Sequence, residues 1–86
     1  MAAAPRVLIV DDYPDAVEVT EMLLTLRGCT CRIAMTGTEA LAVAEEFTPD
    51  VAILDIGLPD ISGFEVAREL RQRNPGRPLY LAAVTG

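Results

Sequence analysis

The sequence contains no histidine, lysine or tryptophan, and all seven of its cationic side chains are arginines. Without histidine, the chain has no imidazole to act as a base, bind a metal or carry a phosphoryl group. No apolar run approaches the roughly 20 residues that a bilayer requires, and the first residues lack the basic and apolar regions of a signal peptide. Thirteen acidic residues give a net charge of −6, which argues against a nucleic-acid backbone as partner. We therefore expect neither a membrane nor a nucleic acid as partner.

Cysteine is also scarce, with only Cys29 and Cys31 in the chain. In an extended strand these two side chains point the same way, which is a poor geometry for a disulfide. One C-x-C pair without histidine provides too few ligands for zinc. We expect free thiols that behave as small apolar side chains in a reducing compartment, the cytoplasm.

With 86 residues, 51% of them hydrophobic, the chain has room for one globular domain spanning residues 1–86. Residues 1–5 are expected to form a flexible N-terminal segment. Four apolar runs predict strands, and they lie at residues 7–10, about 31–35, 51–55 and 79–84. Amphipathic segments between them predict helices that begin near Pro14 and at two capping boxes, Thr36 to Glu39 and Ser62 to Glu65. Strands joined by helices imply a mostly parallel sheet covered on both faces.

Apolar spacing also predicts which face of each helix is buried. In the first helix the three-to-four-residue repeat is formed by Ala16, Val19, Leu23 and Leu26, and Gly28 is placed to end the helix. The repeats of the other two helices consist of Ala40, Leu41, Ala44 and Phe47, and of Phe64, Ala67 and Leu70.

Three predicted strands end in polar residues: Asp11 and Asp12 follow the first, Asp55 ends the third and Thr85 follows the fourth. In an open parallel sheet, ligands bind beyond the carboxyl ends of the strands. Converging carboxylates repel one another unless a cation lies among them. Mg²⁺ fits because it binds one or two carboxylates and keeps waters and phosphate oxygens as its other ligands. Taken singly, each residue also suits a helix cap, a loop or a surface hydroxyl.

Four stretches of the sequence carry a resemblance to a known family. They are VLIVDD at residues 7–12, Gly28, VAILDIGLPDISGFEVAREL at 51–70 and LAAVTG at 81–86, with Gly63 eight residues after Asp55. Over essentially its whole length, the chain resembles the receiver domain of two-component response regulators. The resemblance implies a flavodoxin-like, doubly wound α/β fold with a parallel sheet in the strand order 2-1-3-4.

The resemblance also assigns roles to the strand-end residues. Asp55 would be the phosphoacceptor, attacking phosphorus to form an acyl phosphate. Asp12, Asp55 and the main-chain carbonyl of Gly57 would bind Mg²⁺ directly, with Asp11 acting through a coordinated water. Thr85 would donate its hydroxyl to a phosphoryl oxygen and couple phosphorylation to a switch.

The partner implied by the resemblance is a histidine kinase or a histidine phosphotransfer protein that donates from its own phosphohistidine. Receiver domains catalyse their own phosphorylation and dephosphorylation, so the chain would not be a conventional enzyme. Docking is expected at the rim of the site, formed by Tyr13, Pro14, Val17, Leu58 and Pro59. These five residues also suit an ordinary helix start and loop.

The chain departs from the family pattern at its C-terminal end. Receivers have a fifth strand, further helices and a lysine that pairs with the phosphoryl group, and this sequence has no lysine at all. We therefore expect an incomplete domain whose fourth strand lies at the edge of the sheet. Its residues 79–84 carry no charge and no proline, which favours self-association through that edge.

Three other functions are alternatives to a phosphoacceptor. The missing lysine favours a receiver-like fragment that no longer switches and serves only as a protein-binding or assembly module. A phosphatase with an aspartate nucleophile would place a second aspartate at position 57, where this chain has Gly57. Dinucleotide binding is disfavoured because the Asp11–Asp12 loop has no G-x-G-x-x-G pattern and would repel a pyrophosphate.

Overall fold

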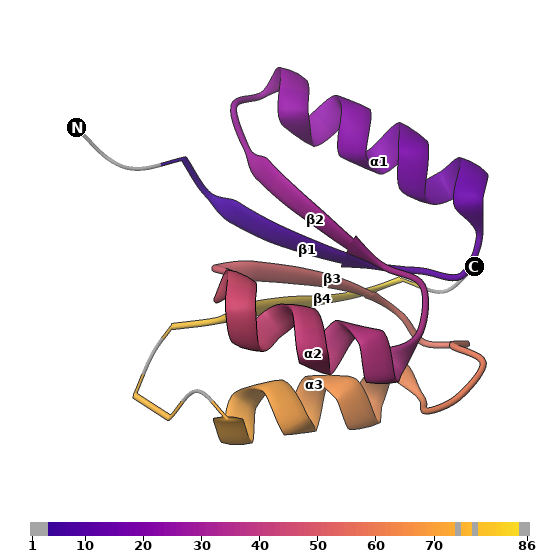
Figure 1. Cartoon of the computed structure of the whole chain (residues 1–86), viewed down its shortest axis with the longest axis vertical. Helices are drawn as coiled ribbons and strands as arrows, with labels where there is room; N and C mark the ends of the chain where they lie inside the picture. The colour runs from indigo at the N-terminus through magenta and orange to yellow at the C-terminus, as the bar shows by residue number, and fades with distance from the viewer. Residues whose placement is uncertain (1–3, 74, 77, 85–86) are drawn as a thin grey trace.

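The strands and helices of the chain alternate as the sequence predicts (Figure 1). The computed structural model describes residues 4–73, 75–76 and 78–84. Within these residues the strands are β1 (Arg6–Val10), β2 (Thr30–Ala34), β3 (Val51–Asp55) and β4 (Tyr80–Val84). The helices are α1 (Pro14–Leu26), α2 (Gly37–Phe47) and α3 (Gly63–Arg73). None of the helices in this part of the chain is both long and apolar enough to cross a bilayer.

The strands form one parallel sheet in the order β2-β1-β3-β4, which confirms the predicted doubly wound topology. Strand β1 is central, and Val7 pairs with Cys31 on one side and with Val51 on the other. All four residues from Val7 to Val10 are buried, as expected for a strand covered on both faces. Of the predicted flexible segment, residues 1–3 lie outside the described residues, and the carbonyl of Pro5 accepts a hydrogen bond from the Thr30 N–H at 2.8 Å.

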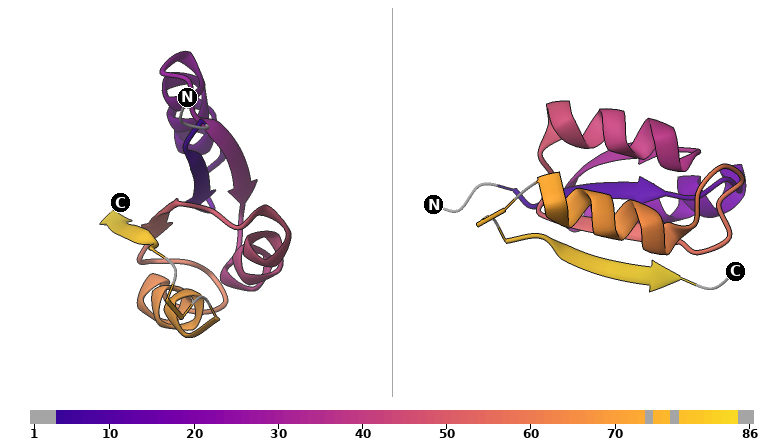
Figure 2. Two further views of the ribbon diagram at one scale, coloured as in Figure 1. Left: turned by 90° about the vertical axis from the view of Figure 1, so that its left-hand side faces the viewer. Right: turned by 90° about the horizontal axis from the view of Figure 1, so that it is seen from below.

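Alternate residues of the central strand belong to two separate hydrophobic clusters. Leu8 and Val10 pack with the buried side chains of α2 and α3, whereas Val7 and Ile9 pack with Val17 of α1. Figure 2 shows α2 and α3 side by side, with α1 away from them. Each face of the sheet therefore has its own layer of helices, α1 on one face and α2 with α3 on the other.

Both cysteines belong to the α1 side of the sheet. Cys29 and Cys31 are free thiols, half-buried and packed against the cluster around Val17. Burial raises the pKa of the Cys31 thiol. This agrees with the prediction that both cysteines serve as small apolar side chains.

The predicted inner face of α3 was partly wrong. Leu70 is fully buried and Ala67 half-buried, but Phe64 is 65% exposed, and the second fully buried residue is Val66. The buried face of α3 is formed by Gly63, Val66 and Leu70, and Phe64 lies beside this face rather than on it. Val66 and Leu70 lie one turn apart and both face the core.

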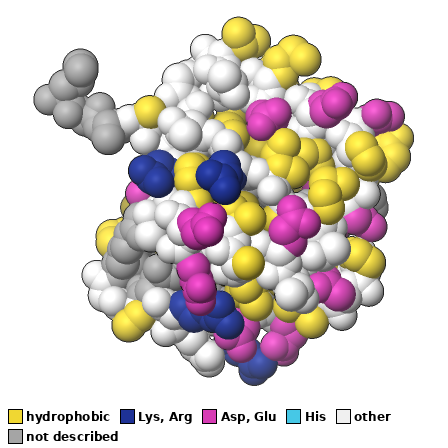
Figure 3. Space-filling model, in the orientation of Figure 1, with side chains coloured by type: hydrophobic (Ala, Val, Ile, Leu, Met, Phe, Trp, Pro, Cys, Tyr) yellow, Lys and Arg dark blue, Asp and Glu magenta, His cyan; other side chains and the backbone are white. Residues whose placement is uncertain are grey.

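The predicted inner face of α1 was also wrong. Val17 is the buried residue of this helix, and Leu24 packs against the same cluster. Val19, Leu23 and Leu26 are more than half exposed. Figure 3 shows hydrophobic and acidic side chains interspersed along α1. The helix has apolar residues on two faces, so their spacing alone did not indicate which face contacts the sheet.

Local patterns in the sequence correctly predict where the helices begin or end. The Thr36 hydroxyl accepts a hydrogen bond from the Glu39 N–H at 3.1 Å, and the Ser62 hydroxyl accepts one from the Glu65 N–H at 3.2 Å. Gly28 follows α1 with φ = 89°, a conformation that favours glycine. These contacts confirm Thr36 and Ser62 as the predicted helix caps and Gly28 as the end of the first helix.

The loop between β3 and α3, residues 56–62, is tied to the start of α2 through Asp60. Its Oδ1 accepts a hydrogen bond from the Gly37 N–H at 2.8 Å. Its Oδ2 accepts two, from the Thr38 N–H at 2.9 Å and the Thr38 hydroxyl at 2.6 Å. The bonds from Thr38, together with the one from Gly37, hold the pKa of the Asp60 carboxyl well below its usual range. The ionised carboxylate thus takes up N–H groups that the first turn of α2 leaves without helical partners.

The corrected inner face of α3 generates a stability prediction. Leu70→Ala should lower the free energy of unfolding by about 2–5 kcal/mol, because it leaves a cavity at a fully buried position. Phe64→Ala on the same helix should change it by less than about 0.5 kcal/mol, because that ring is mostly exposed. Urea denaturation of both variants tests the assignment, and equal losses would contradict it.

The lowered pKa of Asp60 generates a prediction about pH. Its contribution to stability is present above the unfolded-state pKa of about 3.9 and is lost as the pH falls toward the lower folded-state pKa. Asp60→Asn should therefore be less stable than the wild type at neutral pH, and this difference should shrink below about pH 4. Urea midpoints over a pH series provide the measurement, and a difference independent of pH would contradict the prediction.

Candidate functional site

Three carboxylates converge at the carboxyl edge of the sheet. Asp11 and Asp12 follow β1, and Asp55 is the last residue of β3, the neighbouring parallel strand. One carboxylate oxygen from each residue lies within 4.8 Å of the other two. Asp12 is exposed, whereas Asp11 and Asp55 are half-buried. The predicted cluster is therefore present, and it opens to solvent.

Backbone contacts fix Asp11 where β1 passes into α1. Its N–H donates to the carbonyl of Ala34 at 3.1 Å, which extends the β1–β2 pairing by one residue. Its Oδ1 accepts a hydrogen bond from the Tyr13 N–H at 3.0 Å. The turn that this contact closes places Asp12 at the exposed corner before Pro14 begins the helix.

Hydrogen bonds hold both the side chain of Asp55 and the residue that follows it. Its Oδ1 accepts a hydrogen bond from the Gly57 N–H at 3.1 Å, and the following N–H, of Ile56, donates to the carbonyl of Val84 at 3.2 Å. A Cβ on Gly63 would lie 2.6 Å from the Asp55 carbonyl oxygen, so only glycine lets α3 start against this strand end. The eight-residue spacing from Asp55 to Gly63 thus has a steric cause.

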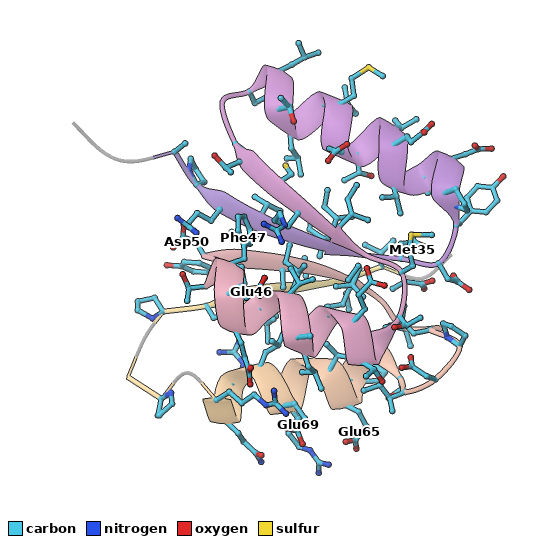
Figure 4. The ribbon with its side chains drawn as sticks, viewed as in Figure 1. Met35, Glu46, Phe47, Asp50, Glu65 and Glu69 are labelled. Carbon is cyan, nitrogen blue, oxygen red and sulfur yellow. The ribbon has the colours of Figure 1, made fainter. Side chains whose placement is uncertain are left out.

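The charge of the cluster is not neutralised by any ion pair among the described residues, because those pairs involve the side chains of Arg32, Arg68 and Arg73 with glutamates. Arg6 lies at the amino edge of the sheet, where its Nε donates to the Phe47 carbonyl at 2.8 Å. Figure 4 shows Phe47 at the end of the molecule opposite to Met35, which follows the carboxyl end of β2.

The donor set suits a hard divalent cation. Three carboxylates in contact range of one another offer oxygen ligands only, and their mutual repulsion is relieved by a positive ion. The open side of the cluster leaves space for water or a phosphate oxygen. These are the properties of a site for Mg²⁺, so the residues present fit the ion that the sequence suggested.

The structure describes Gly57 but not Thr85, the two remaining residues predicted for the site. Gly57 is exposed in the loop after Asp55, and its N–H contacts the Asp55 carboxylate. Thr85 lies outside the described residues. Strand β4 ends beside Asp55, because Val84 pairs with Asp55 in the sheet register. The role assigned to Thr85 stays a prediction.

Three of the five residues predicted to form the docking rim are exposed, and two are buried. Tyr13 is 60% exposed, and Pro14 and Pro59 are exposed as well. Val17 is 3% exposed and Leu58 is 9% exposed, so neither offers a docking surface. Val17 is the side chain through which α1 packs on the sheet, and Leu58 anchors the loop in the opposite core.

Sequence reasoning did not identify Asp60, whose carboxylate holds the loop that carries Gly57 and Leu58. Its hydrogen-bond partners, Gly37 and Thr38, lie 23 and 22 residues away in the sequence. No local pattern signals such a contact. An acidic residue next to a proline reads only as part of a turn.

Comparison with known proteins places this site in a family. The model of the response regulator receiver domain matches residues 7–86. The probable transcriptional regulatory protein TcrX of Mycobacterium tuberculosis is 44% identical over 75 residues, covering 87% of this chain and 32% of TcrX. The chain thus spans about a third of the length of the curated relatives that it matches.

Solved structures agree in fold and in the arrangement of strands. A receiver domain from Methylobacillus flagellatus aligns with a TM-score of 0.89 at 32% identity, covering 96% of this chain and 70% of the other. The response regulator TrrA of Thermotoga maritima, in complex with Mg²⁺ and BeF, aligns at 0.82 and 37% identity, covering 92% and 69%. A chain in a complex of the histidine kinase ThkA with TrrA aligns at 0.82 and 30% identity, covering 95% and 85%. The chain belongs to the family of response regulator receiver domains.

Proposed function

We propose that this chain is a phosphoacceptor module of a two-component phosphorelay. Asp55 accepts a phosphoryl group from the phosphohistidine of a histidine kinase or a histidine phosphotransfer protein. Mg²⁺ is held by Asp11, Asp12, Asp55 and the main-chain carbonyl of Gly57, with Asp11 acting through a water. The observation that carries the proposal is the convergence of three carboxylates within 4.8 Å at an open sheet edge.

The relatives support both the metal and the partner. The TrrA structure contains Mg²⁺ with BeF, and TrrA also occurs in a complex with a histidine kinase. In this chain, exposed Tyr13, Pro14 and Pro59 border the carboxylate cluster and form the proposed docking rim. Free thiols at Cys29 and Cys31 support a reducing compartment, the cytoplasm.

The proposed reaction is a transfer between two nucleophiles. An Asp55 oxygen attacks phosphorus, an O–P bond forms, the P–N bond to the partner's imidazole breaks, and its electron pair returns to that nitrogen. The Gly57 N–H donates to Oδ1 of Asp55. Within the described part of the chain Oδ2 accepts no hydrogen bond, and it is the oxygen proposed to attack. When bound, Mg²⁺ lowers the repulsion between the carboxylates and the incoming phosphoryl oxygens.

A non-switching binding module is the second candidate. It is favoured by one observation, that no ion pair among the described residues brings a cation to the carboxylate cluster, because a positioned cation facing the phosphoryl charge contributes several kcal/mol in sites of this kind. Such a module would keep the fold and the rim while failing to accept a phosphoryl group. Phosphorylation therefore separates the two candidates.

The metal site generates the first functional prediction. The wild type should bind Mg²⁺ with a dissociation constant of about 1 mM, and Asp12→Asn should raise this constant about tenfold or more, a loss of about 1.4 kcal/mol. Amide chemical shifts in a Mg²⁺ titration provide the measurement. Asp15→Asn removes an equally exposed carboxylate from the first turn of α1, outside the cluster, and should change little. An unchanged titration in Asp12→Asn would remove that residue from the site.

Phosphorylation is the second functional prediction. Incubation of the 86-residue chain with acetyl phosphate and Mg²⁺ should add about 80 Da, the mass of one phosphoryl group. The gain should be slow, because no lysine neutralises the developing charge. Asp55→Asn should abolish it, whereas Asp15→Asn should not. Rapid labelling at Asp55 would show that the lysine is dispensable, and no labelling at all would favour the non-switching module.

The third functional prediction is self-association through β4. Strand β4 is the edge of the described sheet, with Tyr80 72% and Val84 45% exposed. An uncharged, exposed edge pairs readily with a second copy. Sedimentation over a concentration series should show species larger than 9.2 kDa. Ala82→Lys, which puts a charge on an exposed position of this strand, should reduce association. A monodisperse monomer at high micromolar concentration would contradict the prediction.

A further inference from the structure

We infer that Asp60 is a positioning residue for the metal site: it clamps the β3–α3 loop onto α2 so that the backbone at Gly57 is held ready for the ion. The inference rests on the proposed function, since it concerns the same Mg²⁺ site. It adds a residue to the proposed site, because Asp60 is not one of the three carboxylates of the cluster.

The clamp consists of a polar and an apolar contact between the same two segments. Three hydrogen bonds of 2.6–2.9 Å join the Asp60 carboxylate to Gly37 and Thr38. Beside them, the side chain of Ile61 occupies the space that a Cβ on Gly37 would need. Charge-assisted bonds at the positive end of a helix are stronger and shorter than neutral ones. Two consecutive loop residues are thus fixed to the first turn of α2.

The loop has further anchors on its other side, and Gly57 lies among them. The Gly63 N–H donates to the carbonyl of Ile56 at 3.2 Å, which closes the base of the loop. The Gly57 N–H donates to Asp55, and Leu58 is buried in the core. The hydrogen bonds that join the described part of this loop to α2 all end on Asp60, so without it the loop would contact that helix through apolar side chains such as Ile61. The orientation of the peptide groups after Gly57 would then be less well defined.

The same contacts explain why Asp60 is not a ligand itself. Asp60 lies five residues after Asp55, so an unpaired carboxylate there would add to the repulsion at the site. Both of its oxygens are instead occupied by donors from α2. The start of α2 thus stabilises the charge of Asp60. The residue anchors the loop and does not serve as a fourth ligand in the cluster.

The test compares two ways of damaging the start of α2. Asp60→Ala cuts the tie between loop and helix, whereas Thr36→Ala removes only the cap to the Glu39 N–H and leaves the tie intact. Asp60→Ala should raise the Mg²⁺ dissociation constant of the folded chain about tenfold, as is typical when an outer-shell partner is lost. Thr36→Ala should lower stability without changing that constant.

Two further variants test the individual hydrogen bonds. Thr38→Val removes the 2.6 Å hydroxyl bond to Asp60 and should weaken Mg²⁺ binding in the same direction, by a smaller factor. Thr38→Ser keeps the hydroxyl and should restore wild-type binding. Binding is followed by amide chemical shifts under conditions where urea denaturation shows each variant to be folded.

A second readout does not depend on the metal. In Mg²⁺-free protein, hydrogen exchange of the Gly57 and Gly63 amides should be faster in Asp60→Ala than in Thr36→Ala. Equal Mg²⁺ constants and equal exchange rates in these two variants would overturn the inference and leave Asp60 as a helix cap. If the wild type binds no Mg²⁺, the proposed metal site is overturned, and the exchange rates still decide whether Asp60 holds the loop.

Discussion

The parallel direction of β1 and β3 is the constraint on which the site depends. Because the two strands are neighbours and run the same way, their carboxyl ends meet at one edge, and Asp11, Asp12 and Asp55 are brought together. Apolar packing on both faces of β1 holds this arrangement. The fold thus brings the carboxylates close enough to repel one another. This repulsion lowers stability and favours the binding of a cation.

The ion pairs that the structure describes leave this repulsion in place. Arg6 contacts Phe47 and Asp50 at the amino edge, with its guanidinium 4.8 Å from the centre of the Phe47 ring. The exposed ion pairs of Arg68 and Arg73 lie with glutamates on the outer surface of α2 and α3. Asp60, the acidic residue nearest to Asp55 along the loop, is taken up by the start of α2. Among the described residues no ion pair offsets the negative charge of the carboxyl edge, and a bound cation would relieve it.

Much of the fold could be predicted because its signals are local. Neighbouring residues are enough to predict the strands, the helix caps and the order of the elements. That order in turn predicts that the strand-end aspartates lie at one edge of the sheet. Local spacing does not determine which face of a helix is buried, since Val19 and Phe64 have apolar spacing but are mostly exposed. Burial of Val17 and Leu58 depends on which element covers them, and Asp60 on partners more than 20 residues away. Predictions failed where tertiary packing, rather than the local pattern, decides the outcome.

The two buried glycines that begin α2 and α3 show how the motif and the site are connected. A side chain on Gly63 would collide with the backbone of Asp55, and one on Gly37 would collide with Ile61 of the loop. Both helices therefore start in close contact with the segment from Asp55 to Gly63, which is packed between them. The spacing by which the sequence resembles its family is thus a packing requirement of this loop. The proposed phosphoacceptor Asp55 directly precedes this loop, and the proposed metal ligand Gly57 lies in it. The packing of α2 and α3 against the loop therefore determines how both proposed site residues are positioned.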